Sequence, residues 1–131
     1  MQESQACQID ARIVDWSASV GTISTHQLYL TSGGGELEQQ FRYVIPNLSV
    51  TANEGAETQT RSLGGQYNGY CRQGGLEVLA DAGFYGSGAR VAREAIALLS
   101  APNCPTGIMD LLLMPEQMML QIHESIGHPI E

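Results

Sequence analysis

Residues 48–62 of the chain read LSVTANEGAETQTRS, and this stretch decides the fold of the first half. Leu48, Val50 and Ala52 alternate with polar residues, which is typical of a strand with one buried face. Residues 53–55 (NEG) carry a turn signal, and the polar, threonine-rich residues 56–62 suit a second strand. The stretch therefore predicts a β-hairpin.

The sequence before this hairpin has the same two-residue spacing of apolar side chains. Apolar residues two positions apart are Val14, Trp16, Ala18 and Val20, then Leu28 and Leu30, then Phe41, Tyr43 and Ile45. Each group predicts a strand with one solvent-exposed face, and residues 32–35 (SGGG) predict a turn between two of these strands. The simplest pairing of consecutive strands is an antiparallel meander.

Helical spacing replaces this pattern in the second half. Residues 89–101 (ARVAREAIALLSA) place Val91, Ala95 and Leu98 on one face, which predicts a helix. Ser87 is its expected N-cap, and Pro102 is expected to end it.

Two more elements are expected after this helix. Residues 107–114 (GIMDLLLM) read as a short, largely buried strand near 107–113. Residues 115–127 (PEQMMLQIHESIG) predict a second helix that starts with proline and ends at glycine. In that helix Met118, Ile122 and Ile126 lie four apart and form an expected core stripe.

Strands first and helices later predict an α+β fold. We expect an antiparallel β-sheet in the N-terminal half, helices after it, and a C-terminal helix that carries the motif described below. The 131 residues are expected to form a single unit, mainly β over residues 1–66 and mainly α over residues 67–131.

Composition limits the partners and the compartment. A formal charge of -8 repels phosphate, so nucleic acid and anionic membranes are poor partners. No apolar run is long enough for a membrane span and the first residues do not resemble a secretion signal, so a cytoplasmic location is expected. Cys7, Cys71 and Cys104 are widely spaced and odd in number, and we expect them to be reduced and buried.

Residues 123–131 (HESIGHPIE) combine two histidines with a glutamate. Two histidines four apart on a helix share a face and can hold one zinc ion. Here the spacing is five, which at about 100° per residue puts His123 and His128 about 140° apart on a regular helix. A regular helix therefore cannot bring both rings to one metal ion.

Two local departures from a regular helix would bring the rings together. Gly127 can take the left-handed conformation that ends a helix, and Pro129 biases His128 away from helical geometry. Alternatively, a one-residue π-bulge draws the rings together. Glu124 suits a general base, because zinc lowers the pKa of water toward about 7. On spacing alone, ordinary surface histidines are the alternative, since catalytic zinc normally has three protein ligands and two are visible.

The string from His123 to His128, followed by Glu131, resembles the HExxGHxxE signature of the TldD/PmbA family of metalloproteases. The likeness extends upstream through residues 89–102 and 107–114 and the glycine-rich region before them. It implies zinc ligation by His123 and His128, a catalytic base at Glu124, and hydrolysis of small unstructured or modified peptides during peptide maturation. The TldD-type partner, which has the histidine motif, is the closer match. The role of Glu131 is left open.

Members of that family are several times longer, and their third zinc ligand is a cysteine in a C-terminal domain that this chain lacks. Neither Cys71 nor Cys104 has a spacing that recommends it as a substitute. The resemblance thus implies a central piece that is inactive alone and holds zinc weakly or not at all. The rival hypothesis is a catalytically dead interaction or oligomerisation module with open β edges. Under both hypotheses we expect a homo-oligomer or a heteromer with a related chain.

Overall fold

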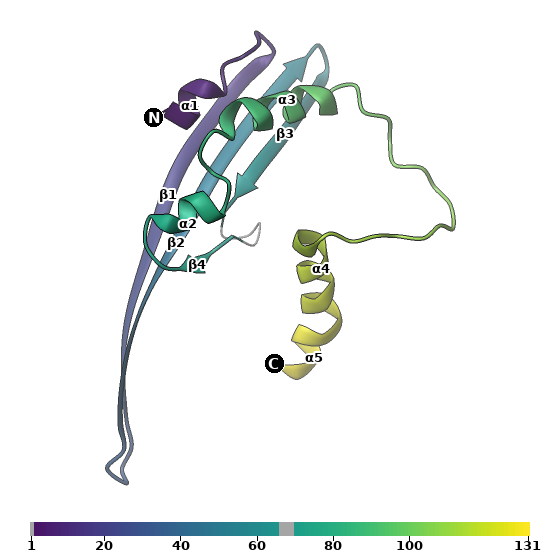
Figure 1. The fold of residues 1–131 in the computed structure, drawn as a ribbon. Helices are drawn as coiled ribbons and strands as arrows, with labels where there is room; N and C mark the ends of the chain where they lie inside the picture. Colours follow the sequence, from purple (N-terminus) through teal and green to yellow (C-terminus); the bar gives the residue numbers. More distant parts are fainter. Residues whose placement is uncertain (1, 66–69) are drawn as a thin grey trace. The chain divides into compact units, whose positions relative to one another are not determined.

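The computed structural model describes residues 2–65 and 70–131, and the chain divides into two compact units, Met1–Ala101 (unit 1) and Pro102–Glu131 (unit 2) (Figure 1). Unit 1 contains α1 (Gln2–Ala6), β1 (Ile13–Leu30), β2 (Glu36–Glu54), β3 (Glu57–Gly64), β4 (Arg72–Gln73), α2 (Glu77–Asp81) and α3 (Gly88–Leu98). Unit 2 contains α4 (Pro115–Ile122), the π-helical turn η1 (His123–Gly127) and α5 (His128–Ile130). The predicted α+β class is confirmed, but two units are found where the sequence predicts one. The expected boundary at residues 66 and 67 lies outside the described residues.

The sheet is the predicted antiparallel meander. β1 pairs with β2 and β2 with β3, while β4 also pairs with β2. The expected turns join β1 to β2 and β2 to β3, and each contains a glycine at positive φ, Gly34 at 87° and Gly55 at 62°. Glycine is favoured there because other residues carry a Cβ that crowds the left-handed conformation.

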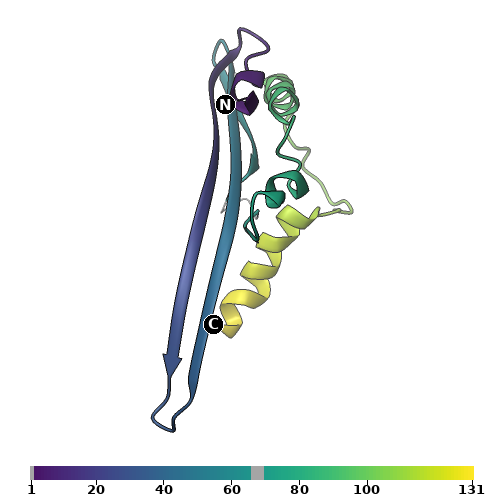
Figure 2. The ribbon, with the colours of Figure 1, turned by 60° about the vertical axis from the view of Figure 1, so that its left-hand side comes forward.

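One face of β2 supplies most of the sheet side of the core. Leu48, Val50 and Ala52 are fully buried, as the alternation in the hairpin predicts. Opposite them the core is completed by α2 and α3 through Val78, Leu79, Val91, Ala92 and Ala95. The helices of unit 1 lie on the same side of the sheet (Figure 2). Apolar burial on this one face therefore holds unit 1 together.

The beginning of β1 departs from the predicted alternation. A bulge between Ile13 and Asp15 leaves Val14 without a partner on β2. Because a bulge shifts the side-chain alternation by one residue, Ile13 is buried and Val14 is 56% exposed. Trp16 and Ala18 pack against the core as predicted.

The far end of the β1–β2 ribbon has no second layer in unit 1 (Figure 1). Tyr29, Leu30 and Leu37 are all more than half exposed. The sequence predicts one buried face for these strands, and this prediction is wrong at the ribbon end among the described residues. Two strands alone have nothing to pack that face against.

Glu3 caps the start of α3, where the sequence predicts Ser87. Its carboxylate accepts hydrogen bonds from the backbone N–H of Gly86 at 2.7 Å and of Gly88 at 3.1 Å. The Ser87 hydroxyl instead donates to the Phe84 carbonyl at 2.6 Å. A carboxylate at this position also meets the positive end of the helix dipole. Glu3 thus ties α1 to α3 across 85 positions of sequence.

Glu3→Ala should lower the free energy of unfolding of the chain by about 1 kcal/mol, the usual cost of losing a helix N-cap. Urea denaturation followed by circular dichroism measures the change. Glu36→Ala, at the exposed start of β2, removes the same charge without removing a cap and should leave the midpoint unchanged. Equal losses in the two variants would contradict the capping role.

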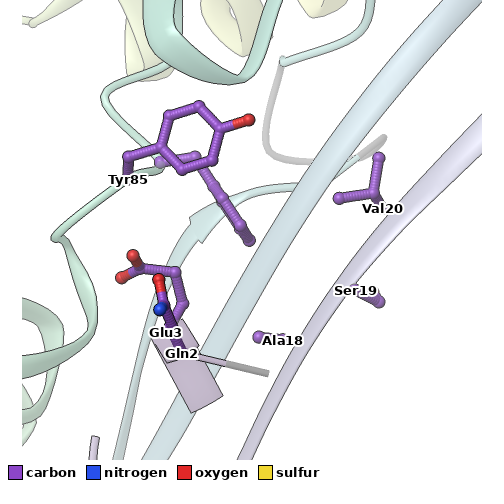
Figure 3. Close-up of a pocket in the computed structure, with 7 residues that line it drawn as sticks. Gln2, Glu3, Ala18, Ser19, Val20 and Tyr85 are labelled. Carbon is purple, nitrogen blue, oxygen red and sulfur yellow. The ribbon is translucent and has the colours of Figure 1, made fainter. Parts of the chain in front are cut away.

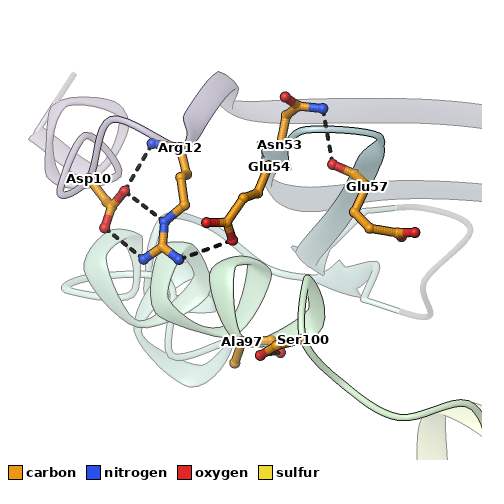
Figure 4. A network of polar contacts seen from close by, with 7 residues as sticks. All are labelled: Asp10, Arg12, Asn53, Glu54, Glu57, Ala97 and Ser100. Carbon is orange, nitrogen blue, oxygen red and sulfur yellow. Dashed lines mark hydrogen bonds and ion pairs between the residues drawn. The ribbon is translucent and has the colours of Figure 1, made fainter.

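A polar network joins the segment before β1 to the β2–β3 turn (Figure 4). The Arg12 guanidinium binds Asp10 at 2.9 Å and Glu54 at 3.5 Å. Its hydrogen bond lowers the pKa of Asp10 to about 2. The Asn53 amide donates to the Glu57 carbonyl at 3.0 Å. These contacts fix the hairpin that the sequence predicts.

The cysteines differ from one another in burial. Cys7 is buried, and burial raises the pKa of its thiol. Cys71 is half-buried and Cys104 is exposed, so the prediction that the cysteines are buried is wrong for Cys104. Cys104 lies in the extended segment that opens unit 2, where no helix or strand covers it among the described residues.

Residues 107–114 form no strand in the described part of the chain. Ile108, Leu111 and Leu112 are each more than three-quarters exposed. The predicted short buried strand near 107–113 is therefore not formed, because a strand needs a neighbour for its backbone groups and no described strand pairs with it. No helix among the described residues has the length and apolar character to cross a membrane.

Candidate metal centre

The helix that carries the histidine motif begins as predicted, at Pro115. Met114 is its N-cap in an extended conformation, with φ −71° and ψ 159°. Proline suits the first turn because its missing N–H would have no helical partner there. The backbone N–H of Met118 then donates to the Met114 carbonyl at 2.9 Å and closes the first turn.

The helix widens into the π-turn η1 at the motif itself. The backbone N–H of His128 donates to the carbonyl of His123, five residues earlier. Gly127 has φ −56°, in the right-handed region, so it does not end the helix in the left-handed conformation. Of the two alternatives that the sequence leaves open, the π-bulge is the one found, and the exit at Gly127 is wrong.

Pro129 gives a physical reason for the wider turn. In a regular helix a proline ring presses against the carbonyl four residues before it, here that of Ser125, and it offers no N–H to that carbonyl. The chain meets this conflict by inserting one extra residue into the turn directly before Pro129. Helical geometry then resumes in α5, with proline in its first turn.

The π-turn brings the three predicted residues together. The rings of His123 and His128 lie 4.4 Å apart between centroids, at 60° to each other. One ligand atom from each of His123, Glu124 and His128 lies within 4.8 Å of the others. All three side chains are exposed, so an ion has free access to them.

Two carboxylates flank the His128 ring. Glu124 Oε2 lies 3.9 Å from His128 Nε2, and Glu131 Oε2 lies 3.2 Å from His128 Nδ1. Glu131 is therefore in contact with the site, although the sequence leaves its role open. Its position three residues after His128 on a helix is the signal that predicts this contact.

Gly127 leaves room for the His123 ring. A Cβ placed on Gly127 would meet His123 Nδ1 at 3.3 Å, closer than an ordinary contact. A side chain here would therefore push the ring of His123. The glycine serves close approach of a side chain to the helix backbone, not the end of the helix.

The side chains of the cluster are of the types that bind zinc, but they are too few for a complete site. Two imidazoles are normal zinc ligands, and a carboxylate beside them suits a base. Catalytic zinc sites normally have three protein ligands and an open position. Cys104 of the same unit does not belong to the cluster. The described part of unit 2 thus offers two ligands and one base.

The apolar stripe of the motif helix is exposed. Met118, Ile122 and Ile126 are 42%, 52% and 55% exposed, so the core stripe that the sequence predicts is not buried. The periodicity is present, but no described residue of unit 2 covers this face, and an amphipathic pattern buries nothing without a second surface.

An open hollow of about 520 Å³ in unit 1 is the other candidate site (Figure 3). It lies between α1, β1 and the segment before α3, and Glu3 and Tyr85 are among its lining residues. The Glu3 carboxylate already accepts two backbone hydrogen bonds there. With Ala18 and Val20 as further lining, this hollow shows no catalytic pair or ligand cluster.

Two curated proteins are similar to this chain over nearly its whole length. One, from Methanothermobacter thermautotrophicus, is named metalloprotease and is 29% identical over 128 residues, which cover 96% of this chain and 26% of that protein. The other, a metalloprotease of Methanocaldococcus jannaschii, is 26% identical over 122 residues, covering 93% of this chain and 26% of that protein. The chain thus spans about a quarter of the length of these relatives. No protein-family model matches it, and no solved structure matches it significantly.

Proposed function

We propose that this chain is the zinc-binding part of a metallopeptidase of the TldD type. The observation that carries the proposal is the π-turn, which gathers His123, Glu124 and His128 on one side of a helix. The relatives named metalloprotease support a metalloprotease family. The likeness of residues 123–131 to the HExxGHxxE signature supports the finer assignment.

Each residue of the cluster has a distinct role in this proposal. His123 and His128 would hold zinc through ring nitrogens, as neutral imidazole does in many zinc sites. When bound, zinc supplies a Lewis acid that polarises a peptide carbonyl and activates water. Glu124 takes a proton from the attacking water on its carboxylate and passes it to the leaving amine.

The proposed substrates are small unstructured or modified peptides, cleaved during peptide maturation in the cytoplasm. An unstructured peptide presents its backbone as a flexible chain. Such a peptide does not need to unfold before its backbone reaches the metal. The substrate class follows from the resemblance to the TldD/PmbA family.

The site is completed from outside these 131 residues in this proposal. Catalytic zinc needs a third protein ligand, and the cluster supplies two histidines. Residues 1–131 then correspond to the central part of a longer enzyme, and they are inactive alone. A two-ligand site holds zinc weakly, because water does not supply the charge of a thiolate.

The second candidate function is that of an interaction or oligomerisation module. It is favoured by the outer edge of β1, which pairs with no described strand, and by the exposed apolar residues of the ribbon end. Open edges and apolar patches promote association with another chain. A homo-oligomer, or a heteromer with a related chain, fits both candidate functions.

Zinc titration of the purified chain tests the proposed function. Competition with a low-affinity chromogenic chelator should give one weakly held zinc ion per chain, and magnesium should not displace it, because nitrogen ligands favour zinc over magnesium. Zinc binding that stays the same when both His123 and His128 are replaced by alanine would contradict the proposal and favour the interaction module.

A further inference from the structure

The two nitrogens of the His128 ring face different carboxylates. Nδ1 lies 3.2 Å from Glu131 Oε2, and Nε2 lies 3.9 Å from Glu124 Oε2. The first distance is at the long end of a hydrogen bond, while the second is too long for one. The ring thus has Nδ1 within hydrogen-bond distance of a carboxylate, while Nε2 faces a carboxylate beyond that distance.

The chemistry of the carboxylate decides where the ring hydrogen lies. An ionised carboxylate only accepts hydrogen bonds, and neutral imidazole carries its hydrogen on one of its two nitrogens. The contact with Glu131 therefore requires the hydrogen on Nδ1. Nε2 then carries the lone pair, which is what a metal ion needs.

Glu131 lies outside the group of side chains that could bind the metal. The cluster consists of His123, Glu124 and His128, with their ligand atoms within 4.8 Å of one another. Glu131 contacts the ring of His128 at Nδ1, whereas the contact with Glu124 is at the other nitrogen, Nε2. Glu131 thus contacts the ring nitrogen of His128 that would not bind the metal, and a carboxylate in this position commonly orients a zinc-bound histidine.

We propose that Glu131 is a positioning residue that fixes the tautomer and the orientation of His128, so that Nε2 is the nitrogen that binds the metal. The inference rests on the proposed function for the identity of the metal. The resumption of helical geometry after the π-turn brings the two side chains together, because residues three apart on a helix are neighbours.

The tautomer can be measured without any metal. Long-range proton–nitrogen NMR spectra of the metal-free chain, taken at alkaline pH where imidazole is neutral, report which ring nitrogen of His128 carries the hydrogen. The wild-type chain should show it on Nδ1. Glu131→Gln should show a mixture, because an amide can accept from Nδ1 or donate to it. Asp110→Asn removes a charge elsewhere in unit 2 and should leave the spectrum unchanged.

Zinc affinity is the second measurement on the same proteins. Chelator competition should give about 10- to 100-fold weaker binding in Glu131→Gln, the usual effect of losing the partner behind a ligand. Asp110→Asn should bind as tightly as the wild type. Finding the hydrogen of the His128 ring on Nε2 in the wild-type chain would overturn the proposal. Weaker zinc binding by Glu131→Gln with an unchanged His128 tautomer would also overturn it, because Glu131 would then act only through its charge. A fixed Nδ1–H tautomer in a wild-type chain that binds no zinc would overturn the metal role of Glu131 together with the proposed function, while the hydrogen bond would stand.

Discussion

His128→Ala should weaken zinc binding by the chain more than about 100-fold. Removing a residue that hydrogen-bonds to a zinc ligand lowers metal affinity by about 10- to 100-fold, and removing the ligand itself lowers it further. The effect should be severe here because the cluster supplies two histidines, so the variant keeps a single imidazole. His123→Ala should have the same effect, since its ring lies 4.4 Å from that of His128.

The third histidine of the chain provides the matched control. His26 lies on β1, is exposed, and contacts Glu38 Oε1 through Nε2 at 2.6 Å. His26→Ala should leave the zinc affinity unchanged. Isothermal titration with zinc, in a buffer of known zinc affinity, measures all the variants. Similar losses of zinc affinity in the His26, His123 and His128 variants would show that zinc binds to any exposed histidine. The cluster would then not be a specific zinc site.

The local parts of the fold are the ones that the sequence predicts. Leu48, Val50 and Ala52 are buried and the following turn closes a hairpin, because alternation and turn chemistry act over a few neighbouring residues. The bulge at Val14 lies outside such rules. Val14 continues the alternation of Trp16 and Ala18 in the sequence, so the pattern gives no sign that the register shifts beside it.

Contacts between distant residues are not predictable from local patterns. Ser87 has the side chain of an N-cap, yet the backbone N–H groups of Gly86 and Gly88 donate to Glu3, which lies 83 and 85 positions away from them in the sequence. Similarly, the apolar residues 107–114 suggest burial, but burial depends on a neighbouring strand that is not among the described elements. Periodicity predicts that a segment has an apolar face, but it does not predict which other segment packs against that face.

The candidate metal site could be predicted in part from the sequence. The residue types and the spacing of five point to His123, Glu124 and His128, but Gly127 and Pro129 are compatible with either of two backbone paths. The structure selects the π-turn, in which the carbonyl of His123 accepts from His128. Glu131 becomes interpretable after that choice, because its reach depends on the helical geometry of residues 128–130.

Glu124→Gln should remove peptide hydrolysis and keep zinc binding. An amide has nearly the size of the carboxylate but cannot take a proton from water, and loss of a general base costs about 10²- to 10⁴-fold in rate. Both proposed histidine ligands stay in place, so zinc affinity should not fall. The measurement needs a complete site. A suitable protein is a chimera in which this chain replaces the stretch of the Methanothermobacter relative that it matches.

Hydrolysis of a fluorogenic unstructured peptide by four proteins separates the possibilities. The chimera should cleave the peptide, and the chimera with Asp110→Asn should match it. The chimera with Glu124→Gln should be slower by the factor above at equal zinc content. The 131-residue chain alone should show no cleavage, because two histidines leave the zinc site one protein ligand short. Cleavage by the chain alone would contradict the need for an outside ligand, and full activity of the zinc-loaded Glu124→Gln chimera would rule out Glu124 as the base.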